Sequence, residues 1–375
     1  MKDVMGIIYT TKDDFALREL TASRAVAALP VVGRYRIIDF MLSSMVNSDI
    51  KNVGVIMQKN YHSLMDHIGA GKEWDLHTKN DGLFILPPFQ TRENQGTYQG
   101  TVDALRSNIS YVKRSNQEYV ILCSTYSVFN TTFDNVLDEH VASGADVTML
   151  YTKYPIEDRS SSSNTAQHCY LDLDEEGAVR NIEMGAEHHE LENFSMNVFL
   201  MKRELLVLLV EQAHAKGIYS IHQAIKAGFL DRGNYLVRGH EYTGYHKRVE
   251  SIPSYYAFNM DMLDEATRKD LFASPVFTKV RDEVPARYAK GAVAINSLLA
   301  DGCVIEGRVE NSVLFRGVRV RKGAVVRNSI IMQESDIREN VEVEHVIFDK
   351  GVTIREGRLI GQKGYPIVIK KNFTL

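Results

Sequence analysis

Residues 6–21, GIIYTTKDDFALRELT, begin with an apolar run that is typical of the first buried strand of an α/β domain. In a nucleotide-binding domain of that class, the loop after this strand usually carries glycines, which let backbone N–H groups approach a phosphate chain. This loop has no glycine after Gly6, and it carries Asp13 and Asp14, whose charges would repel phosphate. The apolar run thus indicates an α/β domain, whereas the loop after it lacks the residues that bind phosphate in nucleotide-binding domains of that class.

Strands and helices alternate along the first part of the chain. Short β-branched runs predict buried strands, and apolar residues at helical spacing predict helices between them. Such alternation is typical of a largely parallel sheet with helices on its faces, where ligands bind beyond the carboxyl ends of the strands. We therefore expect a site near residues 9–16, after Cys123 and at the turn of Gly100. The predicted strands are residues 51–57, 118–123 and 146–151, and the predicted helices are residues 35–47, 61–68 and one that opens with Thr101 as its cap.

The composition is that of an ordinary globular chain and excludes several function classes. The chain has 375 residues, 44% of them hydrophobic and 25% charged, which is long enough for two domains. Its net charge of −4 gives no nucleic-acid footprint, and we expect neither a membrane span nor a signal peptide. Three widely spaced cysteines, Cys123, Cys169 and Cys303, favour neither a disulfide framework nor a zinc site. We expect small buried thiols and a cytoplasmic location.

A repeat fills residues 291–375. An Asn-Ser pair begins at positions 296, 311 and 328, and a Glu-His pair follows at position 344, so the offsets are 15, 17 and 16 residues. Short β-branched runs separated by turns lie between these pairs. This periodicity predicts a hexapeptide β-helix of about four triangular coils, each of which buries its apolar face on the next. An ordinary β-sandwich would not repeat the Asn-Ser offset.

The two predicted domains are joined by a connection. Residues 254–263 have one apolar face and predict a helix, after which Pro275 and Pro285 interrupt regular structure. The expected organisation is an α/β domain over residues 1–240, a helix and linker over 241–290, and the β-helix over 291–375.

Several motifs resemble those of the ADP-glucose pyrophosphorylases, which are the glucose-1-phosphate adenylyltransferases of glycogen synthesis. The block Tyr-Arg-Ile-Ile-Asp-Phe at residues 35–40 is specific to that family, and Gly-Thr-Val-Asp-Ala at residues 100–104 is shared more widely among sugar nucleotidyltransferases. The resemblance covers nearly the whole chain. It implies a Rossmann-like, GT-A-like nucleotidyltransferase domain followed by a left-handed parallel β-helix. The reaction it implies converts ATP and glucose 1-phosphate into ADP-glucose and pyrophosphate with Mg²⁺.

The chain departs from that family where the family carries its catalytic groups. The phosphate-contacting arginine of the family's first loop falls on Ala16, and the glycines of that loop fall on Thr11, Lys12 and Asp14. A glycine-rich loop and a cation that would cradle the phosphates are therefore both missing.

The metal-binding positions of the family are also changed. Its two magnesium carboxylates fall on Thr125 and Arg248, and its sugar-phosphate lysine falls on Gly185. Magnesium binds through carboxylates, and loss of one well-placed electrostatic contact commonly costs about 10²–10³ in rate. We expect little or no turnover from this chain alone, and no cofactor on it.

Other ligand positions keep compatible residues. Gln58, Gly100 and Thr101 match positions that contact the nucleotide in the family, and Tyr98 and Ser195 match positions around the sugar phosphate. They are either a vestigial binding site or scaffold residues kept for packing, and the sequence leaves both interpretations open.

Several charged residues also have two interpretations. Arg248 could place a guanidinium where the family holds its metal ion, and bind an anion without catalysis. The arginines at positions 18, 24, 34 and 36 could form an anion effector site of the family's kind, or simply be solvated. The segment Glu-His-His-Glu at residues 187–190 lacks the spacing of a metal-binding helix and favours a solvated loop.

The resemblance implies one function and leaves two others open. The first is a non-catalytic, regulatory subunit of the GlgD type, which assembles with a catalytic ADP-glucose pyrophosphorylase subunit in a hetero-tetramer and raises its activity, while the partner uses the Mg²⁺. The second is an active glucose-1-phosphate adenylyltransferase with a rearranged metal site. The third is a stand-alone sensor of a sugar phosphate or nucleotide. Homo-oligomers of this chain are also open.

Overall fold

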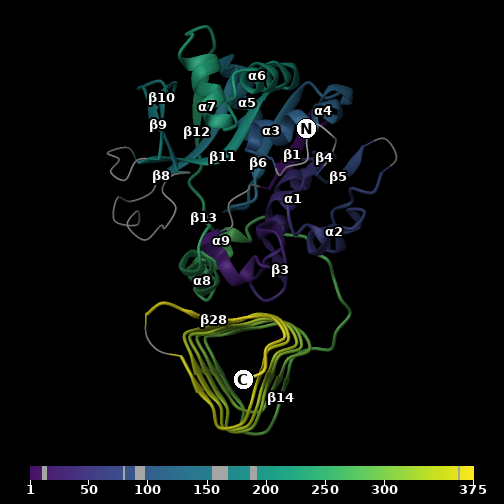
Figure 1. Cartoon of the computed structure of the whole chain (residues 1–375), viewed down its shortest axis with the longest axis vertical. Coiled ribbons are helices and arrows are strands. Elements are labelled where there is room, and N and C mark those ends of the chain that lie inside the picture. The colour runs from purple at the N-terminus through teal and green to yellow at the C-terminus, as the bar shows by residue number, and fades with distance from the viewer. Residues whose placement is uncertain (11–14, 79–80, 89–97, 154–167, 186–191, 362–363) are drawn as a thin grey trace.

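The computed structural model describes residues 1–10, 15–78, 81–88, 98–153, 168–185, 192–361 and 364–375. An α/β domain that contains the N-terminus lies above a triangular β-helix that contains the C-terminus (Figure 1). Helices α8 (Ile252–Asp261) and α9 (Glu265–Leu271) lie between the two. Within the described residues, no helix is long and apolar enough to cross a membrane.

Among the described residues, nine strands form one mixed sheet in the α/β domain. Its order is β10-β9-β11-β6-β1-β4-β5, and β8 joins β11 to β12 on a branch. Strands β6, β1, β4 and β5 run parallel, as the alternation predicts, whereas β11 runs antiparallel to β6 and β8. The strands are β1 (Val4–Tyr9), β4 (Asn52–Ile56), β5 (Gly82–Leu86), β6 (Tyr119–Ser124), β8 (Val147–Lys153), β9 (Cys169–Leu173), β10 (Val179–Met184), β11 (Asn193–Lys202) and β12 (Val237–Glu241), beside the short pairs β2 (Pro30–Val31) with β3 (Tyr35–Arg36) and β7 (Ser127–Val128) with β13 (Lys247–Arg248).

The parallel half of the sheet brings three carboxyl ends to one edge. Strands β1 and β6 pair so that Tyr9 lies opposite Ser124, the last residue of each strand. Tyr9 also pairs with Ile56 at the end of β4. This edge is where a ligand site is expected in an α/β sheet.

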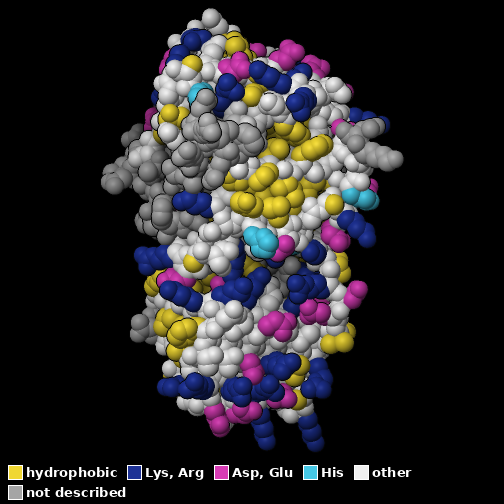
Figure 2. All heavy atoms as spheres, turned by 45° about the vertical axis from the view of Figure 1, so that its right-hand side comes forward, with side chains coloured by type: hydrophobic (Ala, Val, Ile, Leu, Met, Phe, Trp, Pro, Cys, Tyr) yellow, Lys and Arg dark blue, Asp and Glu magenta, His cyan; other side chains and the backbone are white. Residues whose placement is uncertain are grey.

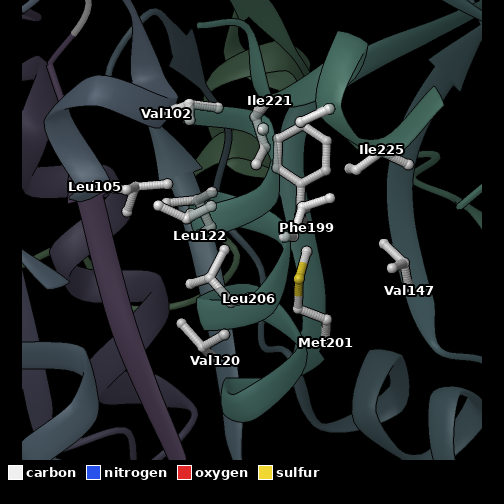
Figure 3. Packing of buried hydrophobic residues seen from close by; sticks show 14 of the residues in the cluster. Val102, Leu105, Val120, Leu122, Val147, Phe199, Met201, Leu206, Ile221 and Ile225 are labelled. Atoms are coloured by element: carbon white, nitrogen blue, oxygen red, sulfur yellow. The ribbon is translucent and has the colours of Figure 1, made fainter. Parts of the chain in front are cut away.

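Successive side chains of a strand point to opposite faces of the sheet, and in β1 the side chains on both faces are buried. Ile7 belongs to a hydrophobic cluster with helices α3, α4, α6 and α7, whereas Ile8 belongs to a second cluster with α1, α2 and α5. In the first cluster the Phe199 ring of β11 lies between Ile221 and Ile225 (Figure 3). The helices are α1 (Ile37–Asn47), α2 (His62–Ile68), α3 (Thr101–Ser107), α4 (Ile109–Arg114), α5 (Asp134–Ser143), α6 (Arg203–Ala215) and α7 (Ile221–Ile225).

The start of α3 corrects one prediction. Gly100 holds the N-cap position, and no side chain caps the helix, so Thr101 is its first residue and not its cap. The Thr101 side chain hydrogen-bonds with that of Tyr9 instead. Side-chain caps do occur elsewhere, because Ser251 opens α8 with a capping box and Asp264 caps α9.

Three five-stranded parallel sheets form the left-handed β-helix. Its described strands therefore form five coils, against a prediction of about four. The last coil carries no Asn-Ser pair, so the periodicity of that pair does not reveal it. The first sheet holds β14 (Arg287–Tyr288), β17 (Val304–Ile305), β20 (Arg319–Val320), β23 (Asp336–Ile337) and β26 (Thr353–Ile354), the second holds β15 (Val293–Ile295), β18 (Arg308–Glu310), β21 (Val325–Arg327), β24 (Glu342–Glu344) and β27 (Leu359–Ile360), and the third holds β16 (Leu298–Leu299), β19 (Val313–Leu314), β22 (Ile330–Ile331), β25 (Val346–Phe348) and β28 (Ile367–Ile369).

The repeated Asn-Ser pairs turn one corner of the triangle. Asn296, Asn311 and Asn328 have φ of 41°, 44° and 47°, a left-handed conformation that asparagine tolerates. The serine after each asparagine accepts a hydrogen bond from the backbone of the next coil. The repeat that is visible in the sequence is therefore a turn requirement combined with a ladder of side-chain bonds.

Candidate functional site

A cavity of about 350 Å³ lies at the carboxyl ends of β1, β4 and β6. Tyr9 and Ser124 line it from the ends of β1 and β6, and Gln58 lines it just beyond β4. Helices α3 and α7 contribute Thr101 and His222 to the lining. The cavity therefore occupies the edge of the sheet at which the sequence predicts a ligand site.

Arg248 contributes a buried guanidinium to this cavity. Its side chain is 8% exposed, and its Nε lies 2.6 Å from Glu250 Oε2. Glu250 Oε1 lies 2.9 Å from His168 Nε2, so the carboxylate joins two nitrogen-bearing groups. The guanidinium carbon lies 5.6 Å from the ring centroid of Phe194 and 5.9 Å from that of Tyr126, within cation–π range. The cation is thus held by an ion pair and by two aromatic faces.

Two buried histidines near Arg248 are neutral at pH 7. Burial, and secondly the charge of Arg248, lowers the pKa of His222 to about 3. Burial is also the larger cause for His246, whose pKa falls to about 3 with added repulsion from Arg248 and Lys247. The Nε2 of His222 lies 2.9 Å from Ser195 Oγ, so the neutral ring is hydrogen-bonded inside the protein.

The end of β6 presents hydroxyl groups and no carboxylate. Ser124 and Tyr126 line the cavity, whereas Thr125 between them is 2% exposed and is not among the described lining residues. The Ser124 Oγ is buried and has no hydrogen-bond partner in the described part of the protein.

The described residues of the cavity do not fit the magnesium ion that the family resemblance implies. Magnesium is held by one or two carboxylates together with water and substrate phosphates. The described residues that line the cavity include no Asp or Glu, and the described chain contains no group of three side chains suited to a metal ion. Glu250 pairs with Arg248 and His168. Among the described lining residues, the charged group is the guanidinium of Arg248.

The cavity is lined by the three residues to which the family resemblance assigns nucleotide contacts, namely Gln58, Gly100 and Thr101. A Cβ at Gly100 would lie 2.5 Å from the Tyr219 carbonyl oxygen. The same oxygen accepts a hydrogen bond from the Val102 N–H at 2.9 Å. Glycine is needed here because residue 219 approaches so closely, which is a packing reason.

Tyr98 and Ser195 are not among the described lining residues. Tyr98 is 2% exposed, and its hydroxyl lies 3.4 Å from Asn108 Nδ2. Ser195 is fully buried, and its Oγ contacts two lining residues, the ring of His222 at 2.9 Å and the Asn197 N–H at 3.4 Å. Both residues have partners inside the protein.

The remaining candidate positions, Ala16 and Gly185, are not among the described lining residues. Ala16 belongs to the short helix η1 (Phe15–Leu20), and Gly185 directly follows β10. The expected glycine-loop positions at residues 11–14 and the segment at 187–190 lie outside the described residues. The structure thus brings Arg248 together with the three nucleotide positions and leaves Thr125, Ala16, Gly185, Tyr98 and Ser195 off the lining.

The sequence reasoning missed the wall formed by residues 219–223 and by Asn197. Ser220 caps α7 by accepting a hydrogen bond from the Gln223 N–H, and a serine before an apolar start is a readable helix signal. Nothing local shows that α7 packs beside α3. Asn197 has φ of 58°, a conformation that its position inside β11 does not reveal.

A second cavity, of about 400 Å³, lies between the α/β domain and the β-helix. Figure 2 shows Lys and Arg side chains gathered at the level where the two domains meet. Arg34 and Arg36 line the cavity, whereas Arg24 is buried in an ion pair with Asp349 and Arg18 is exposed elsewhere. The cations of the lining are Arg34, Arg36, Lys279, Arg281, Arg316 and Lys350.

Comparison with known proteins agrees with this architecture. Residues 16–230 match the nucleotidyl transferase family model, and residues 283–365 match the GlmU-like C-terminal hexapeptide model. The chain is 34% identical to the glycogen biosynthesis protein GlgD of Bacillus subtilis over 99% of its own length and 96% of that protein. It is 37% identical to GlgD of Geobacillus stearothermophilus over 86% of the chain and 82% of that protein. It is also 32% identical to a glucose-1-phosphate adenylyltransferase of Clostridium perfringens, over 90% of the chain and 86% of that protein.

Proposed function

Since the chain belongs to the nucleotidyl transferase family that includes the GlgD proteins and the glucose-1-phosphate adenylyltransferases, we propose that it is the regulatory subunit of a hetero-oligomeric glucose-1-phosphate adenylyltransferase in bacterial glycogen synthesis. It assembles in the cytoplasm with a catalytic subunit, as a hetero-tetramer, and raises that subunit's activity. The partner converts ATP and glucose 1-phosphate into ADP-glucose and pyrophosphate, and holds the Mg²⁺.

The buried guanidinium of Arg248 carries this proposal. Nucleotidyl transfer depends on positioning the phosphates and on cancelling the charge that develops on them. A metal ion does both because it binds several phosphate oxygens at once. The guanidinium of Arg248 is a single charge, and its pairing with Glu250 holds it in place. The described lining offers no carboxylate to hold a metal ion beside it. These features favour a non-catalytic role over that of a slow enzyme.

The open end of the β-helix supports assembly with a second chain. Inward residues of the middle coils, such as Val320, are fully buried, whereas Tyr288, which holds the corresponding position in the first coil, is 53% exposed. Among the described strands, β14, β15 and β16 each pair on one side only. Such edges leave backbone donors and acceptors unpaired, and proteins usually cover them.

Pyrophosphate release tests the proposal. It is measured with ATP, glucose 1-phosphate and Mg²⁺ for this chain alone, for the catalytic subunit of the same organism alone, and for the mixture. We expect no release by this chain alone and a raised rate in the mixture. Substantial release by this chain alone would establish the active-enzyme alternative. An unchanged rate in the mixture, with no complex by light scattering, would favour the stand-alone sensor.

A matched pair of variants locates the contact between the two chains. Tyr288→Ser removes an exposed aromatic group from the first coil, and we expect it to weaken the complex and the stimulation. Val141→Ser removes a similarly exposed apolar group, 56% accessible, from α5 of the α/β domain. That control should leave both readouts unchanged.

A further inference from the structure

We infer that two copies of this chain bind each other along the outer edge of β5, in an antiparallel, two-fold contact centred on Leu86. Strand β5 is the last strand in the order of the described sheet, and among the described strands it pairs with β4 alone. It lies in the α/β domain, apart from the open end of the β-helix, where we propose that the catalytic subunit binds (Figure 1). The inference therefore goes beyond the proposed function and does not depend on it.

Strand β5 differs from other edges of the same sheet in the side chains that it carries. Proteins usually protect an exposed sheet edge with charged side chains. The edge strand β10 carries Arg180 and Glu183, and β12 at the end of the branch carries Arg238 and Glu241. The sequence of β5, Gly-Leu-Phe-Ile-Leu, has no charged or polar side chain, and two prolines follow it. We expect a partner to cover an edge that lacks this protection.

The side chains of β5 belong to a larger hydrophobic surface. Figure 1 places β5 and α2 on the right-hand side, which comes forward in Figure 2, where hydrophobic side chains gather in one patch on the α/β domain. Phe84 is 41% exposed. Its partly exposed apolar neighbours are Tyr61, Met65, Leu83, Ile85, Leu86 and Tyr111. Monomeric proteins rarely expose large contiguous apolar patches, so this one indicates an interaction surface.

The patch continues from the edge of the sheet onto one of its faces. The ring centroids of Phe84 and Tyr111 lie 5.2 Å apart. Gly54 of β4 lies opposite Phe84, and a Cβ at Gly54 would lie 2.5 Å from the ring of Tyr111. Because position 54 has no side chain, the Tyr111 ring can lie close against the sheet beside Phe84. The two rings thus form a broad apolar surface next to the open edge.

The outward backbone groups of β5 are available for a second strand. The Leu86 C=O faces β4, where it accepts a hydrogen bond from the Met57 N–H at 2.9 Å. The backbone groups of successive residues in a strand point to opposite sides, so the Ile85 N–H and the Pro87 C=O point away from β4. Among the described residues, no backbone group bonds to that N–H or to that C=O.

The extent of the open edge fixes the register of the contact. The Leu83 N–H donates to the Leu76 C=O at 2.8 Å, so residue 76 already covers the edge at that point. A two-fold contact centred on Leu86 avoids the covered part. In this register the Ile85 N–H of each copy donates to the Pro87 C=O of the other copy, which gives two hydrogen bonds.

The side chains of two copies complement each other in this register. Every pair that it brings together across the contact is apolar, and such cross-strand pairs stabilise a sheet. The opposed pairs are Leu86 with Leu86, Ile85 with Pro87, and Phe84 with Pro88, in each case one residue from each copy. The contact therefore buries apolar side chains of both copies without burying a charge.

The charges at the two ends of the patch also favour a second copy. Asp81 directly precedes β5, whereas the exposed Lys59 follows β4 and lies beside the carboxyl end of β5. An antiparallel contact brings the acidic end of one copy toward the basic end of the other. This charge complementarity is present twice in a two-fold dimer and is not provided by an arbitrary apolar partner.

Sedimentation velocity of the full chain alone tests the inference. We expect a concentration-dependent dimer. Phe84→Lys places a charge in the contact, and we expect it to weaken the dimer by about tenfold or more. Leu208→Lys is the matched control, because Leu208 on α6 is 40% exposed and should tolerate the same change. A chain that stays monomeric overturns the inference. So does a dimer that Tyr288→Ser dissociates and Phe84→Lys leaves intact, because it uses the end of the β-helix.

A cross-linking experiment tests the register. The three cysteines of the chain are all buried, so an added surface cysteine reports on its own surroundings. In the expected contact the two Leu86 Cα atoms lie about 4.5 Å apart, which is within the range that a disulfide bridges. We expect Leu86→Cys to form a covalent dimer under mild oxidation, seen on a non-reducing gel, and Leu208→Cys to remain monomeric. A Leu86→Cys chain that folds, by circular dichroism, and does not cross-link overturns the contact.

These measurements are independent of the test of the proposed function. Self-association is measured without the catalytic subunit, so a monomeric chain overturns the β5 contact and leaves the regulatory-subunit proposal standing. An unchanged rate of pyrophosphate release in the mixture does the reverse, because the stimulation is then absent while the β5 dimer still forms.

Discussion

The Nη2 atom of Arg24 lies 2.8 Å from both carboxylate oxygens of Asp349, and each of the two side chains is 3% exposed. The residues are 325 positions apart, one in the α/β domain and the other at a corner of the β-helix. A hydrophobic cluster that includes both Phe258 of α8 and Phe315 of the β-helix joins the same two domains. The domains are therefore connected by a buried ion pair as well as by apolar packing.

Asp349→Asn should be strongly destabilising. The change preserves the size of the side chain but leaves the Arg24 charge buried without a counter-charge, which typically costs about 3–5 kcal/mol. The free energy of unfolding in urea, followed by circular dichroism, measures the loss. The double variant Arg24→Met with Asp349→Leu should lose less, because it removes both charges.

An exposed ion pair provides the control. Lys269 and Glu265 lie 2.6 Å apart on α9, at 75% and 69% exposure. Lys269→Ala should cost less than about 1 kcal/mol, because solvent screens such a pair. Equal small losses in Lys269→Ala and Asp349→Asn would show that the junction does not depend on the buried pair.

The buried histidines predict a loss of stability on acidification. In the folded protein the pKa of His222 and that of His246 are each about 3, below the ordinary value of 6.5. Between about pH 3 and pH 6.5, the unfolded chain therefore binds more protons than the folded protein does. Stability therefore rises with pH from about 3 to about 6.5, by up to about 1.4 kcal/mol per pH unit for each histidine. Urea unfolding measured across this window gives the slope.

The variant His222→Gln should make that slope shallower, because glutamine cannot take up a proton and can still hydrogen-bond to Ser195. His62→Gln serves as the control, since the His62 side chain is 91% exposed. If His222→Gln kept the slope of the unmodified protein, the proton uptake would have to belong to other groups.

The serine ladder predicts a difference between inner and outer coils. Ser312 is fully buried, its Oγ donates to the Glu310 carbonyl at 2.6 Å, and it accepts from the Ser329 N–H at 3.0 Å. Ser312→Ala leaves that N–H buried without an acceptor, which costs about 1–3 kcal/mol. Ser297→Ala in the first coil should cost less, because its surroundings are open to water. Urea unfolding of the two variants compares them, and an equal cost would argue against the ladder.

Gly100→Ala should disturb both stability and the cavity. The added Cβ would lie 2.5 Å from the Tyr219 carbonyl oxygen, so the wall formed by α7 has to move away from α3. Overpacking of this kind costs about 1–3 kcal/mol. We expect a lower melting temperature, measured by circular dichroism. Gly144→Asn is the control, because Gly144 has φ of 65° with open space around it, and asparagine tolerates that conformation.

Local sequence predicts the elements whose pattern is local. The runs at residues 51–57 and 118–123 form β4 and β6, since a buried parallel strand needs a short continuous apolar stretch. The Asn-Ser corners are readable for the same reason, because a left-handed turn restricts which residues fit. The antiparallel pairing of β11 with β8 is not readable, because strand pairing depends on contacts between distant segments.

The sequence by itself determined which chemical groups this protein carries. Thr125 and Arg248 stand where the related enzymes are expected to have carboxylates, and the chemistry of a side chain does not depend on the fold. Tertiary structure alone decided how those groups are used. His168 and Glu250 are 82 positions apart yet lie 2.9 Å from each other, and the second oxygen of Glu250 reaches Arg248. Distances between such distant residues follow from the packing of whole strands and helices, and no local pattern encodes them.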